Sequence, residues 1–301
     1  MLKFLKKISI LLVSILIIAN LLSYFSLKFL RQGDFYKPSF LSNTVEENNF
    51  DYIILGASTG LTTLNTKLID SIIGKNGINL SIDDSSLSTQ YLMLQHFFAE
   101  GRTTNICVLA PSVKSYDYKS ETVSANDYRF LPFIERDYVR NYFQSFSGID
   151  ANLLSNSKTF PFLGVSYYNV EVLYPSILTV FKPHYRNRFD SKGNYTYPVN
   201  TNIKDDSVIM GNKKTLKVEF INPDLKKIKA LCEKEGIELI CYISPMKYIS
   251  ITTDNADYKI INHSNVLTKS NYFFDDVHVN RFGRQETSVQ FSKDITSYFN
   301  K

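Results

Sequence analysis

The sequence has few cysteines and no repeated or low-complexity segment. Its three cysteines are an odd number, and each lies in an apolar stretch: Cys107, Cys232 and Cys241. This pattern is typical of buried thiols and speaks against a disulfide framework. The lack of an internal repeat excludes a repeat architecture. At 301 residues, the chain is long enough for a single large core in addition to a short segment of another kind.

An excess of charge of one sign is also absent beyond the first 33 residues. The formal net charge is +5, but residues 1–33 hold five basic and no acidic side chains, which leaves 29 basic against 29 acidic residues in the rest. A neutral domain lacks the basic surface that nucleic-acid binding requires. We therefore expect no nucleic-acid partner.

Metal-binding and phosphate-binding motifs are missing as well. Three of the four histidines are scattered without metal-ligand spacing: His96, His184 and His263. The acidic pairs Asp83-Asp84 and Asp205-Asp206 have no histidine partner nearby in the sequence. Residues 56–60 lack the lysine and the spacing of a phosphate-binding loop. We expect neither a metal site nor a cofactor.

The longest hydrophobic run lies near the amino terminus. Ile8 to Leu27 is twenty residues without a charge, and at about 1.5 Å per residue it covers the roughly 30 Å hydrocarbon core of a bilayer. Three lysines before the run outweigh Lys28 and Arg31 after it, which favours an amino terminus inside the cell. The sequence thus predicts a cytoplasmic segment at 1–7, a membrane anchor at 8–29 that contacts the lipid bilayer, and a main domain on the extracytoplasmic side.

A cleaved signal peptide is the alternative to an anchor. The run is long for a signal peptide, and no convincing small-x-small cleavage site follows it. No cysteine occurs early in the chain, which argues against a lipoprotein. We therefore expect an uncleaved signal-anchor, followed by a short polar linker at 30–49 and one domain at 50–301.

The start of this domain alternates between strand and helix patterns. Strands are predicted at 52–55, 78–82, 105–109 and 237–243, and helices at 64–73, 87–98, 222–236 and around 289–299. Two of the cysteines fall in these strands and the third in a helix. Alternating strands and helices are the signature of an α/β fold with a central parallel sheet.

An aromatic-rich region, about 112–218, looks like an insertion between core strands. A helix is predicted around 133–146, and turn residues between aromatics predict a surface hairpin at 190–195. Clustered aromatic side chains can form stacking surfaces for sugar rings, or they can fill a subsidiary core. Both interpretations stay open.

The stretch 51–60 moves from an apolar run to small residues around Ser58. Its first half is suited to a strand buried on both faces, and Gly56, Ala57 and Gly60 let the backbone turn sharply. A serine at this point lies at the carboxyl end of a parallel sheet, where open α/β folds bind ligands. An ordinary strand-to-helix turn with a capping serine is the alternative.

A second motif, Asp275-Asp276-Val277-His278, lies more than 200 residues further along, before the last predicted helix. A serine hydroxyl becomes a good nucleophile when an imidazole accepts its proton, and that imidazole needs a carboxylate to hold its tautomer. Ser58, His278 and Asp275 supply these three groups, with Asp276 as the other carboxylate that could face the ring. A hydrogen-bonded loop without catalytic function is the alternative for Asp275 and His278.

Together these motifs resemble the SGNH (GDSL-like) hydrolase superfamily over roughly residues 50–110 and 220–300. Gly56-Ala57-Ser58 resembles its Gly-Asp-Ser block, and Asp275 to His278, continued by Asn280 and Gly283, resembles its Asp-x-x-His block. The resemblance implies a three-layer α/β/α sandwich with Ser58 as nucleophile, His278 as base and Asp275 as the residue that orients it.

The two middle blocks of the family depart from its pattern here. The glycine of the second block falls near Asp83 or Asp84, and the Gly-x-Asn of the third is replaced by Ala110-Pro111-Ser112. Both blocks normally donate hydrogen bonds to the oxyanion. The donors expected in their place are the amide of Ser58, backbone amides around Asp84 and Ser85, and the hydroxyl of Ser112.

Family members with this layout act on acyl groups of envelope polymers. The resemblance therefore implies an acyl esterase or O-acyltransferase that uses a cell-envelope glycan or another acylated polymer, together with a membrane partner for acyl transfer. A degenerate member that binds a glycan or an envelope partner without catalysis is one alternative, favoured by the departures in the middle blocks. A purely structural interaction protein is the other, favoured if Ser58 and His278 lie far apart.

Overall fold

The chain divides into two units. The computed structural model describes residues 1–199, 208–209 and 213–299. The anchor unit contains residues 1–46, 121–123 and 127–187, and the sheet unit contains residues 47–120, 124–126 and 188–301. The acidic pair Asp205-Asp206 lies outside the described residues.

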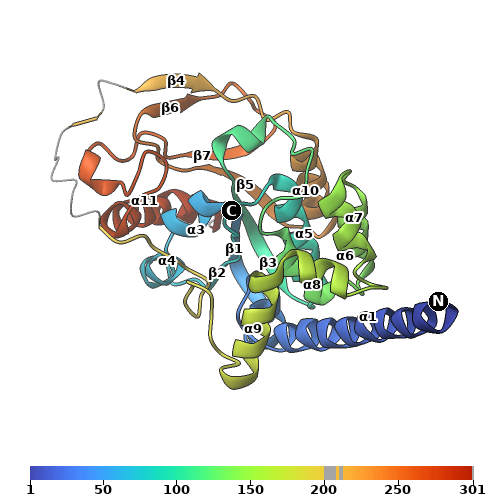
Figure 1. Cartoon of the computed structure of the whole chain (residues 1–301). Helices are drawn as coiled ribbons and strands as arrows, with labels where there is room; N and C mark the ends of the chain where they lie inside the picture. Colours follow the sequence, from blue (N-terminus) through green and yellow to red (C-terminus); the bar gives the residue numbers. More distant parts are fainter. Residues whose placement is uncertain (200–207, 210–212, 300–301) are drawn as a thin grey trace. The chain divides into compact units, whose positions relative to one another are not determined.

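A parallel sheet of five strands forms the centre of the sheet unit, in the order β2-β1-β3-β5-β7 (Figure 1). Its strands are β1 (Asn49–Gly56), β2 (Gly77–Asn79), β3 (Thr103–Ala110), β5 (Glu238–Ile243) and β7 (Lys259–Asn262). The predicted α/β class and parallel sheet are confirmed. Strands β4 (Lys214–Lys217) and β6 (Ile249–Thr252) form a separate parallel pair. No element was predicted from the sequence for the segment that contains β6.

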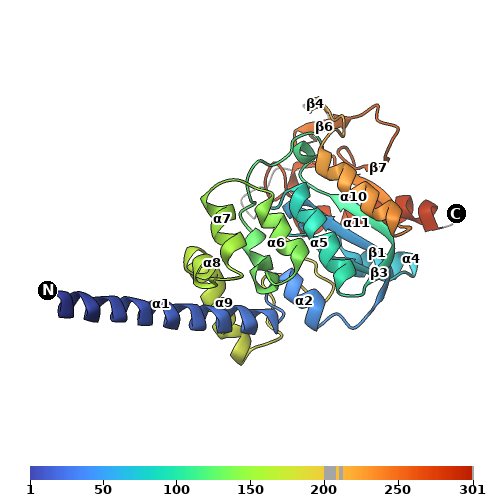
Figure 2. The same cartoon turned by 90° about the vertical axis from the view of Figure 1, so that its right-hand side faces the viewer.

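Strand β1 is buried on both faces, as its run of apolar residues predicts. Tyr52 to Leu55 have no exposed surface. Tyr52 and Ile54 point to the side where the helices α4 (Thr66–Ile73) and α11 (Arg281–Phe299) contribute Ile69 and Phe291 to one core cluster. Helix α5 (Leu87–Ala99) contacts β1, and α10 (Pro223–Lys234) contacts β5 (Figure 2). The alternation of side chains along the strand therefore supplies apolar contacts in both directions.

Three helices of the sheet unit fall close to the ranges predicted at 64–73, 87–98 and 222–236. The last helix begins at Arg281, before the predicted 289, and a short helix directly after β1 was not predicted. The helices of this unit are α3 (Ser58–Thr63), α4 (Thr66–Ile73), α5 (Leu87–Ala99), α10 (Pro223–Lys234) and α11 (Arg281–Phe299), with short 3₁₀ turns η1 (Val113–Tyr116) and η4 (Ser270–Tyr272). Asn222 caps α10 by accepting the Asp224 amide at 2.8 Å. The three cysteines are buried and free, in β3, α10 and β5, as predicted.

The anchor unit is helical. Its elements are α1 (Leu2–Arg31), α2 (Lys37–Asn43), η2 (Asp127–Phe133), α6 (Asp137–Gln144), α7 (Ile149–Asn156), α8 (Phe162–Tyr167) and α9 (Asn169–Phe181). Helix α1 is long and apolar enough to cross a membrane, and a signal sequence has the same properties. Its carboxyl half buries one side against the unit, at Ser23, Leu27 and Leu30. Residues 30–49, expected to be a linker, include the end of α1 and the largely buried helix α2.

The aromatic-rich region contributes to both units. The predicted helix at 133–146 is α6, and the residues before it form the 3₁₀ turn η2, which contains Pro132. Residues 190–195 close a tight turn in which the Gly193 amide donates to the Asp190 carbonyl at 2.9 Å, without flanking strands in the described part of the chain. The turn forms because Gly193 adopts a left-handed φ of +75°.

Candidate active site

Ser58 lies immediately beyond the carboxyl end of β1, as the first residue of α3. The turn requires close approach to β3: a Cβ on Gly56 would lie 2.2 Å from the Ala110 carbonyl oxygen, and one on Gly60 would lie 2.7 Å from it. Only glycine avoids these clashes with backbone. The two glycines therefore allow the chain to turn tightly against β3 and present Ser58 at the edge of the sheet.

Asp275 and His278 form a compact turn of their own. One Asp275 carboxylate oxygen accepts the backbone amides of Val277 and His278 at 2.8 and 2.7 Å, and the other lies 2.8 Å from His278 Nδ1. The carboxylate thus folds the loop and contacts the ring at the same time. The backbone carbonyl of Asp276 instead accepts the Lys247 amide at 3.1 Å. Of the two adjacent carboxylates, Asp275 is the one that meets the imidazole.

His278 also reaches Ser58, which is 220 residues away in the sequence. His278 Nε2 lies 2.8 Å from Ser58 Oγ. In the neutral tautomer with its proton on Nδ1, the ring donates to Asp275 and accepts from the Ser58 hydroxyl. The structure therefore brings the three predicted residues together in one hydrogen-bonded chain at the carboxyl end of the sheet.

The remaining residues of the second motif fix the position of this loop. The Asn280 side chain is buried and caps α11 by accepting the Phe282 amide at 2.9 Å, while its Nδ2 donates to the Asn271 carbonyl at 2.6 Å. A Cβ on Gly283 would lie 2.3 Å from the Tyr272 carbonyl oxygen. The Asn-x-x-Gly continuation thus ties α11 to η4, two residues after His278.

The electrostatics of the site favour an ionised Asp275. Burial alone would raise the pKa of Asp275, but hydrogen bonds from the His278 ring and from the Val277 and His278 amides outweigh it and hold that pKa below its ordinary value. The Asp275 side chain is 46% exposed and the His278 side chain 19%. The carboxylate is therefore charged at neutral pH and available to stabilise a protonated imidazole.

The loop after β2 lies beside the start of the Ser58 turn. The Ile82 amide donates to the Gly56 carbonyl at 3.0 Å. The Ser85 hydroxyl lies 2.6 Å from the Ile82 carbonyl and 3.2 Å from the Gly56 carbonyl, so its proton is directed at these carbonyls. Asp84 is exposed and has a left-handed φ of +48°. The backbone amides of Asp84 and Ser85 are the donors that this loop can offer.

The loop after β3 approaches the same edge. Thr59 Oγ1 donates to the Pro111 carbonyl at 3.2 Å, and Ser112, the next residue, is exposed. The structure thus brings Ser85 and Ser112, from the loops after β2 and β3, to the edge of the sheet where Ser58 lies.

Tyr197 lies against the triad, although the sequence marked it only as one of many aromatic residues. Its ring stacks on Phe274 with centroids 4.4 Å apart and planes 7° apart, and its centroid is 5.2 Å from that of His278. Burial, Tyr195 and the carboxylates of Asp275 and Asp83 raise the pKa of Tyr197, while Arg188 acts to lower it. Tyr197 and Phe274 therefore form an aromatic wall beside the imidazole.

The turn that precedes Tyr197 is fixed to α4. Asn194 Oδ1 accepts the Thr66 amide at 3.0 Å, and Asp190 pairs with Lys67 at 3.0 Å. Tyr197 itself forms a backbone bridge with Asn280. The sequence could not reveal this placement, because it depends on contacts between segments more than 80 residues apart.

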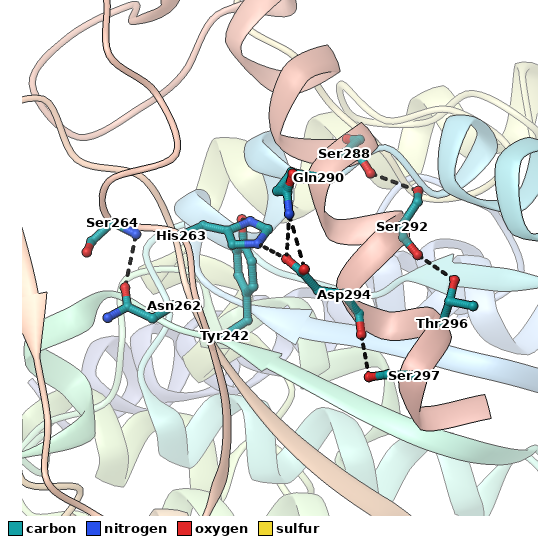
Figure 3. Close-up of polar contacts among 10 residues, drawn as sticks. All are labelled: Tyr242, Asn262, His263, Ser264, Ser288, Gln290, Ser292, Asp294, Thr296 and Ser297. Carbon is teal, nitrogen blue, oxygen red and sulfur yellow. Dashed lines mark hydrogen bonds and ion pairs between the residues drawn. The ribbon is translucent and has the colours of Figure 1, made fainter. Parts of the chain in front are cut away.

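A second histidine–carboxylate pair lies elsewhere in the sheet unit (Figure 3). His263 Nε2 is 2.7 Å from Asp294 on α11, and its Nδ1 is 3.1 Å from the buried Tyr242 hydroxyl. The neighbouring Ser288 and Ser292 hydroxyls donate to carbonyls of their own helix. This cluster offers no activated serine, so the Ser58 site is the better candidate for catalysis.

No group of three or more His, Cys, Asp or Glu side chains that could hold a metal ion occurs among residues 1–199, 208–209 and 213–299.

No family model matches the chain, and a comparison with curated proteins gives no significant match. The geometry of Ser58, His278 and Asp275 is therefore the main support for a function.

Proposed function

We propose that the chain is a membrane-anchored acyl esterase or O-acyltransferase of the SGNH-like kind, whose sheet unit is a three-layer α/β/α sandwich. The observation that carries the proposal is the continuous path from Ser58 Oγ through His278 to Asp275, with two contacts of 2.8 Å each. The strand order β2-β1-β3-β5-β7 supports it, because Ser58 follows β1, an interior strand of an open parallel sheet, at the carboxyl end where such sheets bind ligands.

The mechanism follows from the two ring nitrogens. His278 Nε2 accepts the Ser58 proton as Oγ attacks the acyl carbonyl carbon, and the charged ring is stabilised by Asp275. Collapse of the tetrahedral intermediate breaks the ester bond, and the His278 proton goes to the departing alcohol. Water or a sugar hydroxyl then attacks the acyl-serine while His278 accepts its proton. Collapse of this second tetrahedral intermediate breaks the bond between the acyl carbon and Ser58 Oγ, and His278 returns the proton to Oγ. Water gives hydrolysis, and the sugar hydroxyl gives transfer.

The tetrahedral oxyanion needs donors in place of the two missing blocks. The amide of Ser58 is in the first turn of α3, where backbone N–H groups have no acceptor within the helix. Backbone amides of Asp84 and Ser85 and the hydroxyl of Ser112 are the further donors that we assign. Loss of one oxyanion donor typically costs about 10² to 10³ in rate, so Ser112→Ala measures how much its hydroxyl contributes.

The substrate class that we propose is an acylated cell-envelope glycan or a related polymer, with a membrane partner that supplies or receives the acyl group in the case of transfer. The stacked rings of Tyr197 and Phe274 support it, because a flat aromatic face beside the His278 imidazole suits the apolar face of a sugar ring.

Binding of a glycan without catalysis is the second candidate. The Asp83 carboxylate favours this second candidate. It is close enough to Tyr197 to raise the pKa of the Tyr197 hydroxyl. A negative charge at that edge of the sheet would oppose the developing charge of an oxyanion. A catalytically silent site would retain the aromatic wall and still bind sugar.

We place residues 1–7 in the cytoplasm and the main domain outside, with α1 retained as the anchor. Burial of Leu27 and Leu30 within the anchor unit supports retention, since cleavage after the apolar run would remove part of that packing. A cysteine introduced at the exposed Ile221 should react with an impermeant thiol reagent in intact cells. Labelling only after lysis would contradict this topology.

Activity is tested with the full chain in detergent, on an activated acetyl ester and on an acetylated envelope glycan. Ser58→Ala and His278→Ala should each lower turnover by orders of magnitude, and Ser58 should react covalently with a fluorophosphonate only when His278 is present. Equal background rates in all three proteins would refute catalysis on these substrates. Glycan binding that depends on Tyr197 would then identify the second candidate.

A further inference from the structure

Helix α9 has an exposed face with large apolar side chains on it. The side chains it buries lie on one face: Val172, Pro175, Ser176 and Thr179. The opposite face carries four large apolar side chains that are 59 to 79% exposed: Val170, Tyr174, Ile177 and Phe181. Their spacing of four, three and four residues aligns them in one stripe. A soluble surface helix has polar residues on its exposed face, whereas an exposed apolar stripe is typical of a helix that contacts a membrane.

This stripe lies next to the candidate membrane span. Helices α8 and α9 both pack against α1, and the Phe162 amide at the start of α8 donates to Asn20 Oδ1 at 3.4 Å. Figures 1 and 2 both place α9 against the half of α1 that is farther from the amino terminus. Leu21 and Leu22, on the uncovered side of α1 at this level, are 53 and 62% exposed. The exposed apolar surface of α1 therefore continues onto its neighbours in the anchor unit.

The length of the uncovered part of α1 decides where these neighbours lie. Lys7 is the last charge before the apolar run, and Ala19 is the first residue that is partly buried against the unit. Ile8 to Ile18 spans roughly 16 Å at 1.5 Å per residue, which is about half of the hydrocarbon core. A span that starts after Lys7 must continue to about Leu27, through the section that contacts α8.

We propose that α8 and α9 are immersed in the lipid leaflet on the side of the main domain, beside α1, with the α9 stripe facing the acyl chains. Asn20 is seven residues below Leu27, which is about 10 Å of helix and matches the depth of roughly 5–10 Å reached by interfacial helices. Residues 182–185 after α9 are exposed and include Lys182 and Tyr185, residue types that favour the membrane–water boundary.

Charge near the end of α1 agrees with this position. Lys28, Arg31 and Lys158 line a hollow of about 370 Å³ together with apolar side chains of the same unit, and Glu135 pairs with Lys158 there at 3.6 Å. Three cations against one carboxylate suit the phosphates of lipid headgroups. The anchor unit therefore has apolar side chains for the acyl chains and cationic ones for the headgroup level.

The test uses the lack of tryptophan in the chain, which makes any introduced tryptophan the only one. Three matched variants are Ile15→Trp in the free part of α1, Ile177→Trp on the stripe and Ile221→Trp in the sheet unit, where the native side chains are 52, 59 and 59% exposed. Each full-length variant is reconstituted into vesicles of phosphatidylcholine with or without bromine on the acyl chains, after circular dichroism has confirmed an unchanged fold.

We expect Ile177→Trp and Ile15→Trp to lose most of their tryptophan fluorescence in brominated vesicles. The fluorescence of Ile221→Trp should be the same in brominated and unbrominated vesicles. The proposal is overturned if Ile177→Trp behaves like Ile221→Trp. That outcome is expected if the stripe lies outside the bilayer and binds another protein there, since these vesicles contain no other protein. An unquenched Ile15→Trp would overturn it too, because α1 would then not enter the bilayer.

Discussion

Replacing Asp275 by asparagine should abolish most of the activity without unfolding the loop. One carboxylate oxygen accepts the amides of Val277 and His278, and an introduced side-chain carbonyl can keep both bonds. The new NH₂ group must then face His278 Nδ1. Because NH₂ is a donor, it favours the tautomer with the proton on Nε2, which can no longer accept the Ser58 proton.

The expected size of this effect is a fall in kcat/KM of about 10² to 10⁴. The upper value is that of a fully buried aspartate in a serine protease triad. Asp275 is 46% exposed, so water can replace part of its effect. Each factor of ten corresponds to about 1.4 kcal/mol of transition-state stabilisation.

The assay is steady-state hydrolysis of an activated acetyl ester by the full chain, with Asp276→Asn as the matched control. The control removes the same charge from the adjacent position, which meets no imidazole, and should retain nearly full activity. Thermal unfolding of both variants checks the loop. If Asp275→Asn keeps more than about a tenth of the activity, or if Asp276→Asn loses as much, the assignment of the orienting carboxylate is refuted.

Three further predictions concern the fold and the aromatic wall. Gly56→Ala should destabilise the protein by about 3 kcal/mol or more, because its methyl group would meet the Ala110 carbonyl; an unchanged thermal midpoint would contradict this. Burial lowers the pKa of His263, partly offset by Asp294, so the unfolded chain binds this proton at higher pH than the folded one. Stability measured by urea unfolding should therefore fall as the pH drops below about 6.5, and His263→Gln should flatten that dependence. The facing Tyr242 hydroxyl stays neutral in this range, because burial raises its pKa. Tyr197→Leu should raise KM for an acetylated glycan about tenfold with little change for a small acetyl ester, and equal losses on both substrates would assign Tyr197 to the chemistry instead.

The sequence predicted the parallel sheet because its determinants are local. The run before Gly56 is apolar on both faces, and the pattern of 3.6-residue periodicity recurs between the strands. Ser58 and the pair of Asp275 and His278 were also identifiable from short motifs. Whether Ser58 and His278 meet was not, since it depends on how strands far apart in sequence are ordered in the sheet.

Other features required tertiary contacts that no local pattern encodes. Tyr197 is placed by its bridge to Asn280 and by the attachment of its turn to α4. The aromatic-rich sequence around it therefore did not indicate that Tyr197 lies beside His278. The pairing of His263 with Asp294 spans 31 residues and joins a loop to a helix. Helix α2 lies in a stretch whose polar composition is typical of a linker, and its burial depends on neighbours in the anchor unit.

The separation of Ser58 and His278 in the chain also has a consequence during biosynthesis. Ser58 is made 220 residues before its base, which at about 5–20 residues per second is a delay of roughly 10–40 s. During that interval β1 and α3 can form while the serine remains an ordinary alcohol. The proposed enzyme would therefore be unable to react with acyl donors while it is still being made, and its reactivity toward a serine-directed reagent would report that synthesis and folding of the sheet unit are complete.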